Sequence, residues 1–578
     1  MSLPFTSPQF ASSMVVHALN HVLHSLGVRS TKSFYYLHDA SSLSILDKGR
    51  LAQGGFGLRL VRWLCSGLTL CMLLMPVFEG PSGQSCTCVV LEPAALAIAN
   101  ANRPKPADMY DPGLYRAFQS LLYPYHDFED ELSADELRSE PTSPDDMPHA
   151  ISPEDAAAEV DFIFRVFKYG YAGYQYFGGD DAFGAAKARI LEELSCRSED
   201  ILQNEYESII CSHLGFIQDG HLSLGRTRLC KYYVLFWNPE REFHLDEHGF
   251  YATQDGAACR VLSIEGAAPS KHLKPSINCD GDIVYIPGVI RPELSEGISI
   301  SIEYEDGHAE RMQLEPMKSG RLAGPAYELG QMGEVPLVAS RSFGPTAANL
   351  DYLNAFVEDA GRLRDEPVIV LDLRSNPGGD STYPARWVWR LLLQTAKAQQ
   401  VSAKLTTVTA VALYANTLRH YLSSSQTLAD AAALLGRDDS SPHPGWSRIY
   451  HGAGTTVSND PFIAVITDSF IASAAEGLVL SLRHMDNVVF IGANTRGALL
   501  TGNVALCYLP FSKLGMSVPV MLTPYEDLDN RDGLGLLPDF WVDPDKALDR
   551  VKAFLEKHLV MEAGEARESN PLEGLLNP

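Results

Sequence analysis

The sequence predicts an α/β core with a mostly parallel sheet, preceded by a helical unit and a small β-rich module. From about Val335 onward, apolar β-branched runs at 368–373, 462–466 and 488–491 alternate with segments of helical spacing. Such continuous apolar runs are typical of parallel strands that helices cover on both faces. Upstream of this region the apolar residues recur first at helical spacing and then in short strand-like runs. These observations together favour the α/β fold class.

Residues 1–105 are interpreted as a targeting or signal-like region. The charge-free apolar run 63–78 follows a basic flank, and it is short for a membrane span. An Ala-x-Ala pattern, the kind that signal peptidases cleave, follows at 99–101. We therefore expect an exported protein, which is periplasmic, secreted or attached to a membrane through 63–78. An organellar transit peptide and a buried core helix are the alternatives.

Residues 106–155 are predicted to be an acidic linker. The stretch 127–155 is acidic, poor in apolar residues and punctuated by Pro and Ser, which is typical of a solvated segment. A helical unit is predicted over 156–231. Its apolar residues recur at helical spacing, as in Val160, Ile163 and Phe167, then Ile190 and Leu194, then Ile209 and Leu214.

The β-rich module is predicted over 232–330, where short runs such as 260–266, 282–286 and 298–302 alternate with turn signals. The α/β core then covers 331–560, with a closing helix near its end. The polar tail 561–578 is expected to fray.

Composition excludes several classes of protein. The 578 residues are 46% hydrophobic, which is ordinary for a globular chain. Lys and Arg number 46 against 72 Asp and Glu, so the formal charge is −26 and nucleic acid is a poor partner. Ten cysteines are too few for a disulfide scaffold, and their spacing fits no zinc site. We expect mostly buried thiols, with one or two disulfides if the protein is exported.

The stretch Asp372–Gly379, with the sequence Asp-Leu-Arg-Ser-Asn-Pro-Gly-Gly, directly follows one of the predicted strands. Gly378 and Gly379 allow a sharp turn whose N–H groups point outward, and such groups hold a phosphate or a developing oxyanion. No Gly-Lys-Ser/Thr follows, so a P-loop is excluded. The simpler alternative is a strand–turn–helix connection.

A second stretch, Ser473-Ala-Ala-Glu476, follows the strand predicted at 462–466 and precedes a helical pattern. It fits a capping box, in which the serine caps the helix and the glutamate reaches back to it. The same position suits a nucleophile, because its hydroxyl lies at the carboxyl edge of the sheet, beside the positive end of the helix dipole.

Two further stretches carry polar groups beside glycine turns: Asp219-Gly-His221 and the segment 532–539. Taken alone, a histidine after a turn is usually a hydrogen-bonded polar residue, and a glycine-rich segment with carboxylates is usually a loop.

Together, these stretches resemble the C-terminal-processing (tail-specific) serine peptidase family. The order and spacing of its motifs match at Asp372–Gly379, Ser473–Glu476, Thr495-Arg-Gly497 and Gly535–Asp539, and the resemblance covers roughly 156–560. It implies a ClpP/crotonase-like α/β core, and it implies that the β-rich module is weakly PDZ-like.

The base decides the branch of the family. In the Ser–Lys branch a lysine stands just after the Thr-x-Gly turn, whereas this chain has Arg496 within that turn and no lysine beside it. A guanidinium stays protonated and cannot serve as the base. Lys513 is the nearest lysine downstream and is read as a surface residue. The chain is therefore similar to the Ser–His branch, which includes the tricorn core protease and the chlamydial protease-like activity factor.

This resemblance implies a mechanism in which Ser473 attacks a peptide carbonyl and His221 transfers the proton. Asp532, at the position before the final motif, would orient the histidine, with Asp219 and Glu526 as alternatives. The oxyanion hole would combine the N–H of Gly378 or Gly379 with that of Ala474.

The implied substrates are proteins or peptides in unfolded or extended segments, and neither a metal nor an organic cofactor is needed. A homodimer is left open. Two other classes of protein remain: a non-catalytic ligand-binding protein on the same fold, as in vertebrate retinoid-binding repeats, and a crotonase-like acyl-CoA enzyme. An intact Ser473, His221 and glycine pair argue against the first, and the second needs no serine nucleophile.

Overall fold

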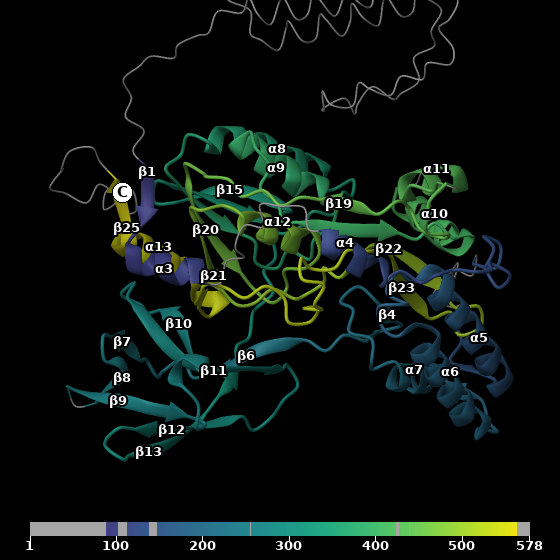
Figure 1. The fold of residues 1–578 in the computed structure, drawn as a ribbon, viewed down its shortest axis with the longest axis horizontal. Coiled ribbons are helices and arrows are strands. Elements are labelled where there is room, and N and C mark those ends of the chain that lie inside the picture. The colour runs from purple at the N-terminus through teal and green to yellow at the C-terminus, as the bar shows by residue number, and fades with distance from the viewer. Residues whose placement is uncertain are drawn as a thin grey trace, which may run out of the picture. The chain divides into compact units, whose positions relative to one another are not determined.

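A six-stranded sheet forms the centre of the described chain (Figure 1). Its order is β15 (Tyr327–Met332), β16 (Val335–Ser340), β17 (Val368–Asp372), β20 (Phe462–Thr467), β21 (Val488–Gly492) and β24 (Phe540–Trp541). The strands from β16 to β24 are mutually parallel, and β15 is antiparallel to β16. The predicted α/β core with a mostly parallel sheet is therefore confirmed.

The structure, a computed structural model, describes residues 88–101, 112–137, 147–254, 256–422, 427–438 and 440–562. These lie in one compact unit, Ser85–Pro578. The apolar run predicted at 63–78 lies outside the described residues. Within the described ranges no helix combines the length and the hydropathy that a membrane crossing requires.

Helices cover both faces of the central sheet. One face packs against α8 (Leu350–Leu363), α9 (Thr382–Leu392) and α12 (Ala474–Leu482), and the other against α3 (Pro93–Ala101) and α13 (Ala547–His558). In β17, Ile369 and Leu371 join the first core, whereas Val368 and Val370 join the second. Because successive side chains alternate between faces, a strand buried on both sides is apolar throughout.

A second sheet joins parts of the chain that are far apart in sequence. Its order is β19 (Tyr450–Gly452), β18 (Gln400–Lys404), β23 (Gly515–Leu522), β4 (Ser223–Leu224) and β5 (Thr227–Arg228), with β22 (Thr501–Tyr508) also paired to β23. It shares one core with six helices: α4 (Pro112–Gln119), α5 (Pro153–Gly170), α6 (Gly179–Ser195), α7 (Gln203–His213), α10 (Val408–Leu422) and α11 (Leu428–Leu435). The predicted helical unit therefore shares a core with residues 401–522 of the predicted α/β core, whereas the strand-rich segment after residue 231 has a core of its own.

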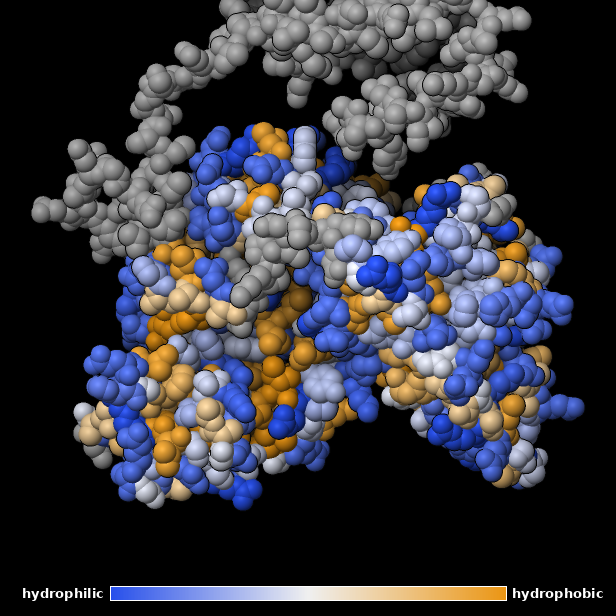
Figure 2. Space-filling model, in the orientation of Figure 1, coloured by the Kyte–Doolittle hydropathy of each residue, from blue (hydrophilic) through white to orange (hydrophobic). Residues whose placement is uncertain are grey.

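The chain between residues 233 and 316 is rich in strands. One antiparallel sheet holds β6 (Tyr233–Trp237), β10 (Leu273–Ile277), β11 (Ile283–Pro292) and β14 (Glu315–Pro316). The other holds β7 (His244–Asp246), β8 (Gly249–Gln254), β9 (Ala257–Ile264), β12 (Ser299–Tyr304) and β13 (Ala309–Gln313). Figure 2 shows apolar surface near β6 and β11. Trp237 of β6 and Ile290 of β11 are partly buried against a small core that includes Trp541 of the central sheet. The hydroxyl of Ser276 in β10 donates to the carbonyl of Trp541 at 2.6 Å, which ties these strands to the central sheet.

The described part of the predicted acidic linker is not solvated throughout. Leu132 and Leu137 are buried in the core of the second sheet. The Glu131 carboxylate accepts the N–H of Val408 at 2.6 Å, at the start of α10, and burial raises the pKa of Glu131. Since isolated leucines among acidic residues anchor the segment, a compositional argument that averages over the stretch misses them.

Residues 88–101 also differ from the interpretation as a targeting segment. Strand β1 (Cys88–Leu91) pairs with β25 (Leu559–Glu562), so part of the predicted tail is a strand as well. Ala99 is fully buried in α3, against the central sheet. The Ala-x-Ala pattern therefore lies in a packed helix, where a peptidase does not reach it without local unfolding.

Candidate active site

Three of the sequence motifs follow the carboxyl ends of three neighbouring parallel strands. Asp372–Gly379 begins at the end of β17, Ser473 follows β20, and Thr495–Gly497 follows β21. Carboxyl ends of parallel strands meet at one edge of a sheet, where ligands bind in open α/β folds. The topology therefore brings these motifs to the same edge.

Ser473 directly precedes α12 and has φ 54° and ψ −122°. This backbone conformation is rare for a residue with a Cβ atom and stores strain. The N–H of Ser473 donates to Glu476 at 3.1 Å, which is the glutamate half of the predicted capping box. A serine held in strain at the positive end of a helix is a suitable nucleophile.

Glu476 ties the nucleophile to the Thr-x-Gly turn. It is fully buried and accepts the hydroxyl of Thr495 at 2.6 Å, the N–H of Gly497 at 2.8 Å and the N–H of Ala498 at 2.7 Å. Burial raises the pKa of Glu476. Both carboxylate oxygens accept hydrogen bonds, so Glu476 links the Ser473 motif to the Thr-x-Gly turn.

The Asp219-Gly-His221 turn lies against the Thr-x-Gly turn. A Cβ atom on Gly220 would lie 2.4 Å from the carbonyl oxygen of Gly497, so only glycine permits this approach. The carboxylate of Asp219 accepts the N–H of His221 at 2.8 Å and the hydroxyls of Tyr171 and Thr501 at 2.7 and 2.9 Å. His221 is therefore brought to the edge that carries Ser473, although nearly half the chain separates them.

The side chain of Asp532 binds the backbone of the Asp219–His221 turn. Its carboxylate accepts the N–H of Gly220 at 2.9 Å and those of Leu499 and Leu500 at 3.0 and 3.1 Å. Burial, and then the charge of Asp219, raises the pKa of Asp532 to about 7. Contrary to the expected contact with the imidazole, Asp532 thus binds the residue before the histidine.

The imidazole of His221 has no hydrogen-bond partner among the described residues, and its Nδ1 is buried. Burial lowers the pKa of His221, which keeps the ring neutral and able to accept a proton. The two alternative acids do not supply the missing partner. Asp219 bonds the backbone of His221, and Glu526 accepts the N–H of Gln399 at 3.0 Å and lies 3.3 Å from His484 Nε2.

Lys513 lies in the hairpin turn between β22 and β23, with φ 57°. In the described ranges it makes no ion pair, and no hydrogen bond links its ammonium to the residues around Ser473. The Ser–Lys arrangement therefore gains no support.

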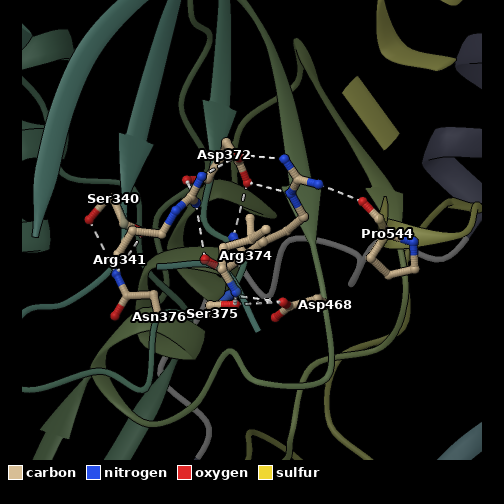
Figure 3. A network of polar contacts seen from close by, with 9 residues as sticks. Ser340, Arg341, Asp372, Arg374, Ser375, Asn376, Asp468 and Pro544 are labelled. Atoms are coloured by element: carbon tan, nitrogen blue, oxygen red, sulfur yellow. Dashed lines mark hydrogen bonds and ion pairs between the residues drawn. The ribbon is translucent and has the colours of Figure 1, made fainter. Parts of the chain in front are cut away.

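The Asp372–Gly379 loop is held by a buried polar network (Figure 3). Burial opposes ionisation of Asp372, but the guanidinium groups of Arg374 and Arg341, the latter 2.6 Å away, hold the pKa of its carboxyl below the usual value. The N–H of Ser375 donates to Asp468 at 2.8 Å. These contacts fix the start of the loop.

Asn376 fixes the end of the loop. Its side-chain amide donates to the carbonyl of Ser340 at 3.2 Å, and its Oδ1 accepts the N–H of Gly378 at 2.9 Å. The N–H of Gly378, one of the predicted oxyanion donors, is thereby occupied. Within the part of the chain that the structure describes, the N–H groups of Gly379 and Ala474 have no acceptor.

These two donors lie beside the nucleophile. A Cβ atom on Gly378 would lie 2.9 Å from the Cβ of Ser473 and 2.8 Å from the nitrogen of Ala474. The loop is thus packed directly against Ser473 and α12. Sequence reasoning placed Glu476 only as a cap and gave Asn376, Tyr171 and Thr501 no role, because their partners are distant in the sequence.

The comparison with known families agrees with this geometry. Residues 340–540 match peptidase family S41. Three solved structures align with low similarity. Mature CPAF complexed with lactacystin has 12% identity and a TM-score of 0.37, over 69% of this chain and 96% of that one. The photosystem II D1 C-terminal processing protease has 14% identity and a TM-score of 0.32, over 68% of this chain and 97% of that one. The tricorn protease has 10% identity and a TM-score of 0.31, over 69% of this chain and 35% of that one.

The motifs and the S41 match define the class of protein as a serine peptidase. Within that class, residues 340–540 of this chain match peptidase family S41. The assignment rests on the match over these residues and on the motifs at one sheet edge.

Proposed function

We propose that this chain is an endopeptidase that hydrolyses peptide bonds in unfolded or extended protein segments, with Ser473 as the nucleophile. One observation carries the proposal: Ser473 holds a strained conformation at the start of α12, beside the N–H groups of Gly379 and Ala474, which have no acceptor among the described residues. A helix cap alone needs neither the strain nor the two free donors.

In this mechanism the neutral imidazole of His221 takes the proton of the Ser473 hydroxyl as the oxygen attacks the carbonyl carbon. The ring later gives that proton to the leaving amine. The imidazole has no hydrogen-bond partner in the described chain, and such contacts often tighten only when substrate is bound.

The tetrahedral intermediate carries its negative charge on the former carbonyl oxygen. The N–H groups of Gly379 and Ala474 would stabilise this charge without reorganising, because Asn376 and Glu476 already bind the N–H groups of the preceding residues, Gly378 and Ser473. The positive end of α12 adds to the same effect.

Asp532 would act as a positioning residue. Its carboxylate holds the N–H of Gly220 and the backbone after the Thr-x-Gly turn, so it sets where His221 stands relative to Ser473. Asp219 holds the N–H of His221 from the other side.

A covalent serine probe tests this function. The full chain is treated with a fluorophosphonate beside Ser473→Ala, His221→Ala and the control Ser469→Ala, which removes a nearby hydroxyl from the same loop. We expect labelling and casein cleavage in the wild type and the control, and their loss in the other two variants. Labelling that survives in Ser473→Ala would assign the wrong nucleophile. Folded wild type that neither labels nor cleaves would favour a binding protein on a peptidase fold.

Export remains a proposal that rests on the apolar run 63–78 and its basic flank. It includes the options of secretion and of membrane attachment through that run. Fractionation of cells that make the full chain with a C-terminal tag tests it. Tagged protein confined to the soluble cytosol at full length would contradict export.

A further inference from the structure

The Thr-x-Gly turn carries a cation, Arg496, that has no acidic partner among the described residues. The guanidinium carbon of Arg496 lies 3.7 Å from the centre of the Tyr232 ring, which is a close cation–π contact. In the described ranges this guanidinium makes no ion pair and no hydrogen bond, and its Nε is buried. The hydroxyl of Tyr232 is also buried and without a partner there. Two unused donor groups therefore lie side by side.

The main chain places Arg496 beside the nucleophile. Its N–H donates to the carbonyl of Ile471 at 2.8 Å, two residues before Ser473. Its neighbours Thr495 and Gly497 both donate to Glu476, which in turn accepts the N–H of Ser473. The backbone of Arg496 is therefore fixed next to the Ser473 loop.

The carboxylates of the site do not need this cation. The donors to Glu476, Asp219 and Asp532 are backbone N–H groups and the hydroxyls of Tyr171, Thr495 and Thr501. Acidic residues outnumber basic ones by 72 to 46 in this chain, yet Arg496 is left without an acidic partner in the described part. An unpaired cation in an acidic protein points to an anion that comes from outside.

A second arginine flanks the same loop. The guanidinium carbon of Arg321 lies 5.3 Å from the centre of the Phe470 ring, three residues before Ser473. The next residue, Leu322, donates its N–H to the Ser375 hydroxyl at 2.9 Å, so this segment also borders the predicted oxyanion loop. Arg321 is exposed and forms no ion pair in the described ranges.

We propose that Arg496, together with the hydroxyl of Tyr232, binds a carboxylate of the substrate close to the scissile bond, with Arg321 as a weaker, exposed contributor. The carboxylate belongs either to an Asp or Glu side chain or to the free C-terminus of the substrate. This inference rests on the proposed peptidase function and adds a substrate class to it: segments with a negative charge near the cleavage point. A planar guanidinium suits such a group, because its N–H groups can donate in pairs to a carboxylate.

The first arm of the test maps cleavage sites. Casein is digested by the wild-type full chain, and the cut positions are read by mass spectrometry. Asp or Glu enriched at one position near the cut supports the side-chain source, and cuts confined to the C-terminal end support the terminal source. Cuts with no carboxylate preference at any position would overturn the proposal.

The second arm measures the preference quantitatively. A peptide that spans the best casein site is compared with the same peptide carrying Gln for Glu, and with its C-terminal amide. We expect kcat/KM to fall about tenfold or more when the recognised carboxylate is neutralised, as for loss of a charge-assisted hydrogen bond. Arg496→Gln should remove this ratio while leaving cleavage of the neutral peptide, and Arg496→Lys should keep part of it.

The matched control is Arg390→Gln, which removes one positive charge from an exposed position on α9. It should leave the ratio unchanged, since a general charge effect would alter both variants alike. A ratio that is the same in Arg496→Gln and in wild type would overturn the proposal, provided that circular dichroism shows the variant to be folded.

A binding arm separates this proposal from the proposed catalysis. Fluorescein-labelled Glu and Gln peptides are titrated against Ser473→Ala and against Ser473→Ala with Arg496→Gln. Tighter binding of the Glu peptide only when Arg496 is present supports the carboxylate site even if the wild type cleaves nothing, in which case only the peptidase proposal fails. Equal binding of the Glu and Gln peptides to Ser473→Ala would overturn the proposed carboxylate site.

Discussion

Ser473 has positive φ, a conformation that costs an L-residue free energy but that glycine adopts readily. The residue is held there by its bond to Glu476 and by the packing of Gly378 against its Cβ. We interpret the strain as the cost of placing a nucleophile at the start of the helix, beside the donors of Gly379 and Ala474. At this position the residue that suits catalysis is therefore not the residue that would make the fold most stable.

The strain predicts that Ser473→Gly is more stable than Ser473→Ala, by about 1 kcal/mol, because glycine relieves the backbone and alanine does not. Both variants should lose labelling by the fluorophosphonate. Urea unfolding of the two proteins measures the difference. An alanine variant as stable as the glycine variant would show that the conformation is not strained.

Asp532 predicts a dependence of stability on pH. Its pKa is raised to about 7 in the folded chain, above the ordinary value of 3.8, so the folded state binds the proton more tightly than the unfolded state. This contribution to stability is fully present below the unfolded pKa and is lost as the pH rises through about 7. Between about pH 6 and about pH 8 the wild type should therefore lose about 1 kcal/mol more of its unfolding free energy than Asp532→Asn. Urea unfolding of both proteins at the two pH values tests this, and equal losses would contradict the raised pKa.

At the scale of elements, the site depends on how closely the loop after β17 approaches the start of α12. Gly378 has φ 90°, and a Cβ atom there would lie 2.6 Å from the carbonyl oxygen of Ala472. The network through Asn376 holds this approach from behind (Figure 3). Two elements that are nearly a hundred residues apart thus form one rigid wall of the site.

This close packing predicts that Gly378→Ala lowers the rate of fluorophosphonate labelling by about 100-fold or more, since one wall must move away from Ser473. Gly477→Ala is the matched control. Gly477 lies in α12 four residues beyond Ser473, and a Cβ atom there has open space around it. That control should label normally and gain about 0.5–1 kcal/mol of stability, because alanine favours a helix interior. Normal labelling of Gly378→Ala would show that the wall is not needed.

At the scale of the whole molecule, the folded unit begins before the predicted helical unit and closes on itself. Strand β1 pairs with β25, and the Nδ1 of His558 lies 3.0 Å from the carboxylate of Glu92. Leu91, Ala95 and Ala99 are buried against the central sheet. The segment 88–101 is therefore part of the layer that packs against the central sheet, which carries the site at its edge.

A chain that starts at residue 102 should consequently be less stable than one that starts at Ser85. Loss of one buried leucine and two buried alanines removes about 3 kcal/mol of apolar burial, in addition to a strand pair. Thermal unfolding followed by circular dichroism should show a lower midpoint by several degrees for the shorter chain. Equal midpoints would mean that 88–101 is dispensable and would restore the targeting interpretation for it.

The sequence by itself determined three adjacent strands of the central sheet and the places where the motifs begin. A parallel strand covered on both faces must be apolar along its length, so β17, β20 and β21 are legible from local composition alone. Their order along the chain then brings Asp372–Gly379, Ser473 and the Thr-x-Gly turn to one edge. The resemblance added the histidine, which no local pattern distinguishes from an ordinary polar residue.

Only the tertiary structure decided what the polar groups of that edge do. It turned Asp532 toward the N–H of Gly220 and occupied the N–H of Gly378 with Asn376. It also buried two leucines of the acidic segment and left Arg496 without an ion pair in the part of the chain that the structure describes. These outcomes depend on which donors and acceptors, often hundreds of residues apart in the sequence, the fold brings together. Hydrogen bonds are short and directional, so their pairing is set by the packed geometry and leaves no periodic trace in the sequence.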